Sequence, residues 1–376
     1  MPMTEHKISF CIVCMNRLHQ LKRTLLQNIV DNQRYTSLEY ILLDYNSQDG
    51  LEEWAKENLG ELITNNRLVY YKTFEPAVFN HSHSKNVAFS LATGEIVCNI
   101  NADHYTGAEF ASYVNQQFTA DNNIVLTPVD FYKTKKGHRV PKDVYGKVVV
   151  KKSDFLAIKG FDEQMKGYGF EDWDFINRLE LINVKRVLIE DCNFLQFISH
   201  GQDERFTLPT DHFKRLYVHH CTPSISEIIY IYKDNYYERG VLIDNSTQDA
   251  DKYVHAYKPR TYLFEYGLKN LVWESGEWKE LPEGDCIQFS SRYSPGFILQ
   301  RVFYDQEALM CKRTKAIFYP ITSRSIVNNL LQFNYDLHNR LILENNLKYK
   351  KYITNLCDFG KVTVFKNFQY DIPIVL

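Results

Sequence analysis

The chain has 376 residues, enough for two domains of ordinary size; 44% of them are hydrophobic and 24% are charged. This composition is typical of a folded globular protein, and it excludes a collagen-like or largely disordered chain. Lys and Arg number 44 against 46 Asp and Glu, for a net charge of -2. No overall basic field therefore favours nucleic acid as a partner.

Neither a membrane span nor a secretion signal is predicted, because the sequence has no run of about 18 apolar residues and no apolar core near its start. Among eight scattered cysteines, Cys11 and Cys14 are more typical of a buried strand with reduced thiols than of a zinc or redox site. We expect a cytoplasmic protein, with a peripheral position at the inner face of a membrane as the alternative. The basic runs 133–136 and 151–152 are expected to be solvated; contact with an acidic polysaccharide or lipid headgroups is the other interpretation.

The first half of the chain alternates short apolar runs with helical patterns. Strand-type runs lie at 8–13, 39–44, 68–72 and 95–100, and helical patterns lie at 17–30, 51–58 and 82–92. This alternation predicts an α/β fold with parallel strands, because parallel neighbours need a crossover connection. Open sheets of this kind bind ligands at the carboxyl ends of their strands.

Polar residues follow three of the predicted strands. They are Asn16 and Arg17 after the first, Asp44, Tyr45, Asn46 and Ser47 after the second, and Asn101, Asp103 and His104, with Ala102 between them, after the fourth. In a single loop, Asp and Asn would be explained as residues that end strands and cap helices. Three such loops at one edge of a sheet instead predict a shared polar cleft.

Beyond about residue 250, the helical alternation gives way to short runs rich in Tyr, Val and Phe. Turn-type segments such as 274–278, 282–285 and 293–296 separate these runs, which is the pattern of a β-rich domain. We therefore expect an α/β domain at 1–245 and a smaller β-rich accessory domain without catalytic groups at 246–376. A helical pair is expected near 325–349.

Asp103 carries the first chemical signal. A carboxylate at the end of a buried strand is able to bind a hard divalent cation, and such a cation in turn holds a diphosphate. His200 follows another strand-like run and would add a second ligand, although a histidine at a strand end is more often a surface residue. His81 and His83 are not expected as a metal pair, because residues two apart on a helix face apart.

The segment 166–179 carries the second signal. Glu171, Asp172 and Asp174 crowd three carboxylates at the expected start of a helix, where the helix dipole accounts for one or two of them. The same segment contains Gly169, which allows close approach of the backbone to a ligand. It also contains Tyr168 and Trp173, whose aromatic rings suit the face of a sugar. Together these residues predict a general base beside a ligand for an acceptor hydroxyl.

The order of these motifs resembles that of family 2-type glycosyltransferases with the GT-A fold. The matching segments, within about residues 7–215, are 16–17, 44–49, 84–86, 92–95, 101–103, 160–163, 169–172 and His200. The later segments are most similar to the galactosyltransferase-type module of β-1,4-galactosyltransferases and bacterial chondroitin polymerases. The resemblance implies a Rossmann-like nucleotide-diphospho-sugar transferase domain followed by the β-rich accessory domain.

The resemblance also implies roles for individual residues. Asp172 matches the catalytic base and Glu171 the neighbouring acceptor-binding carboxylate, with Tyr168, Gly169 and Trp173 also on the acceptor side. Asp103 and His200 match the ligands of a divalent cation, Mn²⁺ or Mg²⁺. The residues matching the donor nucleotide site are Asn16, Arg17, Asp44, Asn46, Lys85, Asn101, Ala102 and Asp103.

The activity implied by the resemblance is inverting transfer of a hexose-type sugar from a UDP-sugar to an oligosaccharide or lipid-linked glycan, in bacterial capsule or lipopolysaccharide synthesis. One alternative is a retaining transferase of the GalNAc type. Another is a non-catalytic carbohydrate-binding or assembly subunit with a decayed transferase domain, because Asn101 replaces the first Asp of the family's DxD motif. A nicotinamide oxidoreductase is disfavoured, since no GxGxxG follows the first strand.

Overall fold

The computed structural model describes residues 5–129, 144–199, 213–222, 225–243, 273–282, 285–291, 296–302 and 305–376. The chain divides into two compact units. The first unit combines Met1–Gly201 with His338–Leu376, and the second is Gln202–Leu337. The later boundary falls within one long helix, α11 (Arg324–Lys348).

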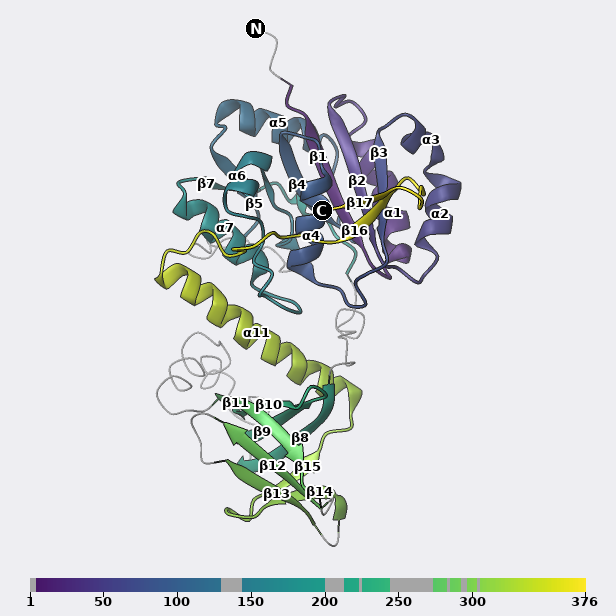
Figure 1. Ribbon diagram of the computed structural model, residues 1–376. Helices are drawn as coiled ribbons and strands as arrows, with labels where there is room; N and C mark the ends of the chain where they lie inside the picture. Colours follow the sequence, from purple (N-terminus) through teal and green to yellow (C-terminus); the bar gives the residue numbers. More distant parts are fainter. Residues whose placement is uncertain are drawn as a thin grey trace. The chain divides into compact units, whose positions relative to one another are not determined.

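A nine-stranded mixed sheet forms the centre of the first unit (Figure 1). Its strands, in spatial order, are β17 (Pro373–Val375), β16 (Thr363–Lys366), β3 (Leu68–Thr73), β2 (Leu38–Tyr45), β1 (Ile8–Cys14), β4 (Ile96–Asn101), β6 (Val149–Lys151), β5 (Ile124–Thr127) and β7 (Lys185–Leu188). The pairs β1–β2, β2–β3 and β1–β4 are parallel, as the alternation of strands and helices predicted. Because β1 and β2 are buried on both faces, they read as nearly continuous apolar runs.

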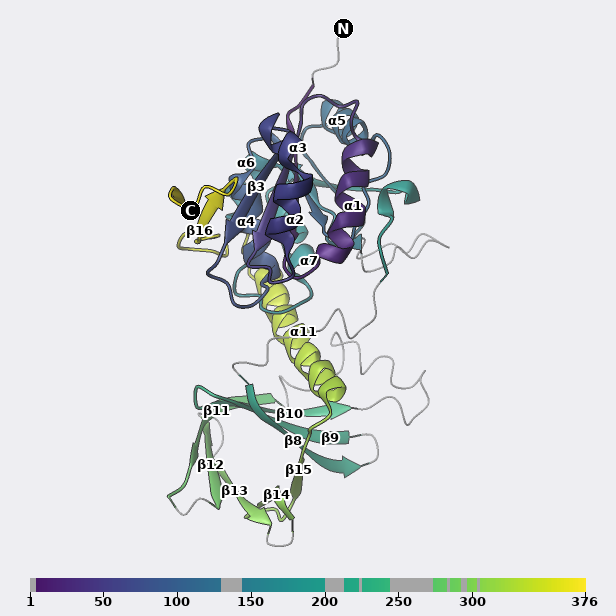
Figure 2. The same cartoon turned by 90° about the vertical axis from the view of Figure 1, so that its right-hand side faces the viewer.

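Helices cover both faces of this sheet (Figure 2). One face packs against α1 (Leu18–Asp31), α2 (Leu51–Asn58), α3 (Gly60–Thr64) and α5 (Phe110–Ala120), and the other against α4 (His81–Leu91), α6 (Lys152–Ala157) and α7 (Glu171–Leu181). A short 3-10 helix, η2 (Cys192–Leu195), follows β7. Side chains alternate along β1, so that Phe10 and Ile12 join the first core and Cys11 and Val13 join the second. Among the helices of the described residues, none has the length and apolar character needed to cross a lipid bilayer.

The strand registers bring the predicted polar loops to one edge of the sheet. Cys14 of β1 pairs with Asp44 of β2, and Val13 of β1 pairs with Asn101 of β4. The three strands therefore end at nearly the same level, and their carboxyl ends are neighbours. This arrangement confirms that the loops after β1, β2 and β4 lie together.

Cys11 and Cys14 are buried in β1, as expected for strand residues, and both are free thiols. Burial raises the pKa of both thiols well above the ordinary value. A thiol that resists ionisation is a poor nucleophile and a poor metal ligand. These two cysteines therefore act as small apolar core residues.

The second unit contains a closed barrel of eight antiparallel strands. The strands are β8 (Phe213–Thr222), β9 (Ile225–Tyr232), β10 (Tyr236–Ile243), β11 (Trp273–Glu280), β12 (Cys286–Ser291), β13 (Phe297–Val302), β14 (Asp305–Cys311) and β15 (Ile317–Pro320). Side chains from all eight strands form one core, in which Phe289 and Phe297 stack with ring centroids 4.5 Å apart. A second cluster joins Leu216 and Ile228 of the barrel to Leu330 and Leu331 of α11. The β-rich character expected for this part of the chain is thus observed, in the specific form of a barrel.

The division of the chain differs from the boundary expected at 245/246. Strands β8, β9 and β10 precede that boundary but belong to the barrel, because β15 pairs with β8 and β10 pairs with β11. Residues 338–376 belong to the first unit, where β16 pairs with β3 and β17 pairs with β16. The barrel is therefore inserted between two parts of the α/β unit.

Candidate active site

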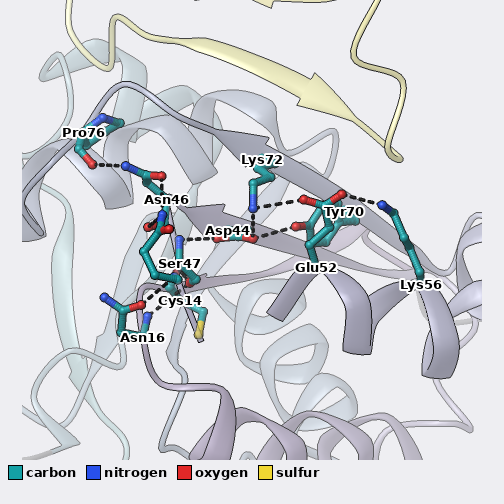
Figure 3. Close-up of polar contacts among 11 residues, drawn as sticks. Cys14, Asn16, Asp44, Asn46, Ser47, Glu52, Lys56, Tyr70, Lys72 and Pro76 are labelled. Atoms are coloured by element: carbon teal, nitrogen blue, oxygen red, sulfur yellow. Dashed lines mark hydrogen bonds and ion pairs between the residues drawn. The ribbon is translucent and has the colours of Figure 1, made fainter. Parts of the chain in front are cut away.

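Two asparagines shape the loops after β1 and β2 (Figure 3). Asn16 and Asn46 have φ angles of 56° and 64°, a left-handed backbone that asparagine tolerates better than most residues. Oδ1 of Asn16 accepts a hydrogen bond from the backbone N–H of Gln48 at 2.7 Å, and Nδ2 of Asn46 donates to the carbonyl of Pro76 at 2.9 Å. The carbonyl of Arg17 accepts bonds from the first turn of α1. These three predicted donor-binding residues lie in neighbouring loops.

Asp44 lies near the end of β2 and is fully buried beneath these loops (Figure 3). Its Oδ2 accepts hydrogen bonds from the Tyr70 hydroxyl at 2.7 Å and from Nζ of Lys72 at 3.0 Å, and its Oδ1 accepts one from the backbone N–H of Ser47 at 2.7 Å. Lys72 also contacts Oε2 of Glu52 at 3.2 Å. Because its carboxylate is fully buried and accepts three hydrogen bonds, Asp44 has a structural role in holding β2, β3 and the loop after β2 together.

The segment Asn101–Asp103 begins with the last residue of β4 and is fixed from both sides. Oδ1 of Asn101 accepts a hydrogen bond from Asn99 at 2.9 Å, and the carbonyl of Ala102 accepts one from the Thr24 hydroxyl at 2.6 Å. The carbonyl of Asp103 accepts one from the backbone N–H of Ile198 at 2.9 Å. The backbone around Ile198 is thus paired with the backbone of the residue predicted to bind the metal.

The predicted metal site is described only in part, because His200 lies outside the described residues. Nε2 of His104 is 3.7 Å from Oδ1 of Asp103, and the Asp103 side chain is 14% exposed. Within the described ranges, no cluster of three His, Cys, Asp or Glu side chains could hold a metal ion. The carboxylate of this partly exposed side chain nevertheless has the hard-ligand chemistry that Mg²⁺ and Mn²⁺ prefer.

Lys85 lies between the two carboxylates predicted for catalysis. It is on α4, and its Nζ donates hydrogen bonds to Oδ1 of Asp172 at 2.6 Å and to Oε1 of Glu171 at 3.1 Å. All three side chains are buried. Lys85, which was predicted to lie beside the donor, thus contacts both acids, because α4 and α7 pack on the same face of the sheet.

The two acids differ in how many of their oxygens are occupied. Oε2 of Glu171 accepts a hydrogen bond from the backbone N–H of Gly169 at 3.1 Å, so both of its oxygens have partners. Asp172 accepts from Lys85 through Oδ1, and within the described part of the chain no group donates to its Oδ2. Glu171 is thus held in place, whereas Asp172 keeps an oxygen for a further partner.

Burial and the local charges give Glu171 and Asp172 very different pKa values. Burial raises the pKa of Asp172 to about 7, and repulsion from Glu171 adds to this against the attraction of Lys85. Burial also disfavours the ionised form of Glu171, but the charge of Lys85 and local hydrogen bonds outweigh it and lower the pKa to about 2. Near neutral pH, Glu171 is an anion and Asp172 is able to take up a proton.

The acceptor-side residues predicted from the sequence surround this pair. The Tyr168 ring meets His81 edge-on with centroids 5.3 Å apart, and Trp173 contacts Phe170 with centroids 5.9 Å apart. Gly169 has a φ of 111°, which non-glycine residues rarely adopt, and this conformation turns its N–H toward Glu171. Tyr168, Gly169 and Trp173 are all partly exposed.

His81 is a member of this group that sequence reasoning missed. It begins α4 one turn before Lys85, and its Nδ1 lies 3.9 Å from Oε1 of Glu171. Burial lowers the pKa of His81 to about 4, so its imidazole is neutral at physiological pH despite the nearby carboxylate. The spacing of four between His81 and Lys85 could have indicated a shared helix face.

Comparison with known proteins gives one family match. Residues 130–209 match a family described as the N-terminal domain of galactosyltransferase. This segment includes Glu171 and Asp172, and the match supports the predicted glycosyltransferase. No curated protein matches the chain.

Several solved structures are similar to part of the chain. One is the mannosyltransferase PcManGT from Pyrobaculum calidifontis in complex with GDP-Man and Mn²⁺, with 19% identity, a TM-score of 0.41, and coverage of 50% of this chain and 56% of that chain. Another is S. aureus TarS 1-349, with 17% identity, a TM-score of 0.39, and coverage of 49% and 58%. The TarS 1-349 complex with UDP-GlcNAc has 15% identity and a TM-score of 0.38, and the match covers 53% of this chain and 63% of that chain. The chain thus spans little more than half the length of the first two of these structures.

Proposed function

We propose that the chain is an inverting GT-A glycosyltransferase that moves a hexose-type sugar from a UDP-sugar to a carbohydrate hydroxyl. The observation that carries this proposal is the pair formed by Glu171, which is anchored through both oxygens, and Asp172, which keeps one oxygen available. The galactosyltransferase family match, which includes this pair, supports the class of reaction.

Asp172 acts as the general base in this proposal. Its carboxylate takes the proton from the acceptor hydroxyl as that oxygen attacks the anomeric carbon of the donor. The bond from the anomeric carbon to the diphosphate breaks on the opposite face, and the electron pair leaves with UDP. One displacement of this kind converts an α-linked donor into a β-linked product.

The neighbouring residues position the acceptor. Glu171 remains ionised and orients the sugar through hydrogen bonds, while the partly exposed ring of Tyr168 and the indole of Trp173 offer apolar surfaces to its face. The positive charge of Lys85 offsets the repulsion between two buried carboxylates, which lets both stand close to the same substrate.

The donor side is proposed at the loops after β1, β2 and β4. Asn16, Arg17 and Asn46 would bind the nucleotide, with Asn101 and Ala102 beside it, whereas Asp44 and Lys85 contribute through the bonds described above. Asp103 and His200 would hold a divalent cation, Mn²⁺ or Mg²⁺. When bound, this cation neutralises negative charge on the diphosphate.

The acceptor and the cellular role remain predictions. An oligosaccharide or lipid-linked glycan of bacterial capsule or lipopolysaccharide is the acceptor class implied by the sequence resemblance, and a cytoplasmic or peripheral membrane position goes with it. The retaining and non-catalytic alternatives make different predictions for the product.

A donor screen tests the proposal. The protein is incubated with UDP- and GDP-sugars, Mn²⁺ and a panel of oligosaccharides, and nucleotide release and the anomeric configuration of the product are measured. Release of UDP with a β-linked product from an α-linked donor is expected. An α-linked product would establish the retaining alternative, and binding of glycans without turnover would establish the non-catalytic one.

A further inference from the structure

The C-terminal half of α11 is bonded to the loop that carries the acceptor-side residues. Asn339 is buried, and its side-chain amide makes three hydrogen bonds to the backbone of that loop. Its Oδ1 accepts from the N–H of Lys166 at 3.0 Å, and its Nδ2 donates to the carbonyls of Lys166 at 2.8 Å and Gly169 at 2.9 Å. One side chain therefore fixes both ends of the segment Lys166–Gly169.

The backbone of this loop is unusual. Gly167, Gly169 and Phe170 have φ angles of 66°, 111° and 71°, so three of four consecutive residues are in conformations rarely adopted by L side chains. Phe170 carries a Cβ, so this left-handed backbone is disfavoured for it, whereas glycine adopts it readily. The guanidinium of Arg340, next to Asn339, lies 5.9 Å from the centre of the Phe170 ring.

The restraint extends from Asn339 to the anchored carboxylate. Gly169 accepts from Asn339 through its carbonyl and donates to Oε2 of Glu171 through its N–H. Both peptide groups that flank Gly169 are thereby oriented. Tyr168, which contacts His81, is held between the two bonded ends of the segment.

We propose that Asn339 is a positioning residue for acceptor binding, acting through the loop Lys166–Phe170. The expected effect on acceptor kinetics rests on the proposed function. The expected restraint of the loop rests on the three hydrogen bonds alone. The proposal assigns a role in the active site to a segment that was expected to contain no catalytic group. Asn339 acts through Gly169 and Tyr168, without itself touching the reacting atoms.

The kinetic experiment compares two alanine variants of the same helix. Asn339→Ala removes the three bonds, whereas Asn345→Ala removes an identical side chain from an exposed position of α11. We expect Asn339→Ala to reduce kcat/KM for the acceptor by roughly 10–100-fold through the acceptor KM, with the donor KM unchanged. Asn345→Ala should leave both constants unchanged. Equal losses for donor and acceptor, or an unchanged acceptor KM, would overturn the inference.

A second measurement separates this inference from the proposed function. Amide hydrogen exchange of residues 166–170 requires no substrate, and it should accelerate in Asn339→Ala but not in Asn345→Ala. If the wild-type protein transferred no sugar, the proposed function would be wrong. Faster exchange of residues 166–170 in Asn339→Ala would still show that Asn339 positions this loop. Unchanged exchange in a folded variant would refute that contact.

Asn339→Asp serves if the alanine variant does not fold. It keeps an oxygen for the N–H of Lys166 and loses both donors, so an intermediate acceleration of exchange is expected. Exchange in Asn339→Asp equal to that of the wild type would count against the inference.

Discussion

Nζ of Lys85 lies 2.6 Å from Oδ1 of Asp172, although 87 positions of sequence separate the two residues. The same ammonium group is 3.1 Å from Oε1 of Glu171, so one positive charge is shared by two buried carboxylates. When both acids are ionised, the three groups together carry one negative charge. Addition of a proton to Asp172 neutralises the group, which suits a general base.

Asp172→Asn should abolish base catalysis without disturbing the donor. The amide keeps the shape of the side chain but cannot take a proton from the acceptor. We expect kcat to fall by roughly 10²–10⁴ while the affinity for UDP stays the same. Steady-state kinetics and calorimetric titration with UDP measure the two quantities. Glu180→Gln, an exposed substitution on the same helix, is the matched control, and normal kcat in a folded Asp172→Asn protein would remove Asp172 from the mechanism.

The rate should depend on pH through the same residue. A base works only when deprotonated, and the pKa of Asp172 is raised to about 7, so kcat/KM should decrease as pH falls through about 7 and level off above it. The profile is measured over the range in which the protein stays folded. Glu171, whose pKa is lowered to about 2, should not contribute an inflection near neutrality. A wild-type profile that is flat through this region would contradict the assignment.

Lys85→Met should move this inflection to higher pH. Without the ammonium group, repulsion between Glu171 and Asp172 is no longer offset, so Asp172 binds its proton more tightly. Removing one member of a buried charge group should also destabilise the fold, by roughly 3–5 kcal/mol. The pH profile and urea unfolding measure the two effects, with Lys85→Arg as the charge-conserving control. An inflection that stays in place in folded Lys85→Met would show that Lys85 does not set the acidity of Asp172.

Asp103→Ala should remove the dependence of UDP binding on a divalent cation. The wild-type affinity for UDP is expected to rise when Mn²⁺ is added, because the cation links the Asp103 carboxylate to the diphosphate. In the variant, Mn²⁺ should have little effect on UDP binding. Asp121→Ala, which changes an exposed aspartate of the same unit, provides the control titration. Full wild-type activity in EDTA would overturn the metal prediction.

Asp44→Ala distinguishes a structural role from a nucleotide-binding one. The buried carboxylate accepts three hydrogen bonds, and its loss would leave Lys72 with Glu52 as its remaining acidic neighbour among the described residues. We expect the free energy of unfolding to fall by roughly 3–5 kcal/mol, measured by urea denaturation. Glu57→Ala on the exposed face of α2 should have almost no effect. Wild-type stability together with weaker UDP binding would assign Asp44 to the nucleotide instead.

Local sequence patterns predicted much of the α/β unit. The buried strands β1 and β2 and the helix α1 have apolar residues at the spacings that their geometry requires. Their positions were therefore predictable from the pattern of apolar residues alone. The polar loops after β1, β2 and β4 were also predictable, because parallel strands bring their carboxyl ends together. The grouping of Glu171 and Asp172 required only that they begin the same helix.

Contacts between distant elements were not predictable in the same way. The bond from Lys85 to Asp172 depends on how α4 and α7 pack, and no periodicity within either helix specifies that packing. Asn339 reads as an ordinary polar residue of a helix until its loop partners are known. The four residues of β16 carry no signal that they pair with β3 rather than with a neighbouring strand, so the return of residues 338–376 to the α/β unit was not predictable from the sequence.

The pairing of β16 with β3 can form only late in the synthesis of the protein, because the two strands are far apart in the sequence. The N–H of Tyr70 bonds to the side chain of Asn367, 297 positions later, which the ribosome adds on the order of tens of seconds after it has made β3. During that interval the barrel segment emerges, while β3 remains an edge strand with unpaired backbone groups. Such edges are sites of intermolecular pairing, so the nascent α/β unit would be open to chaperones until the last strands arrive.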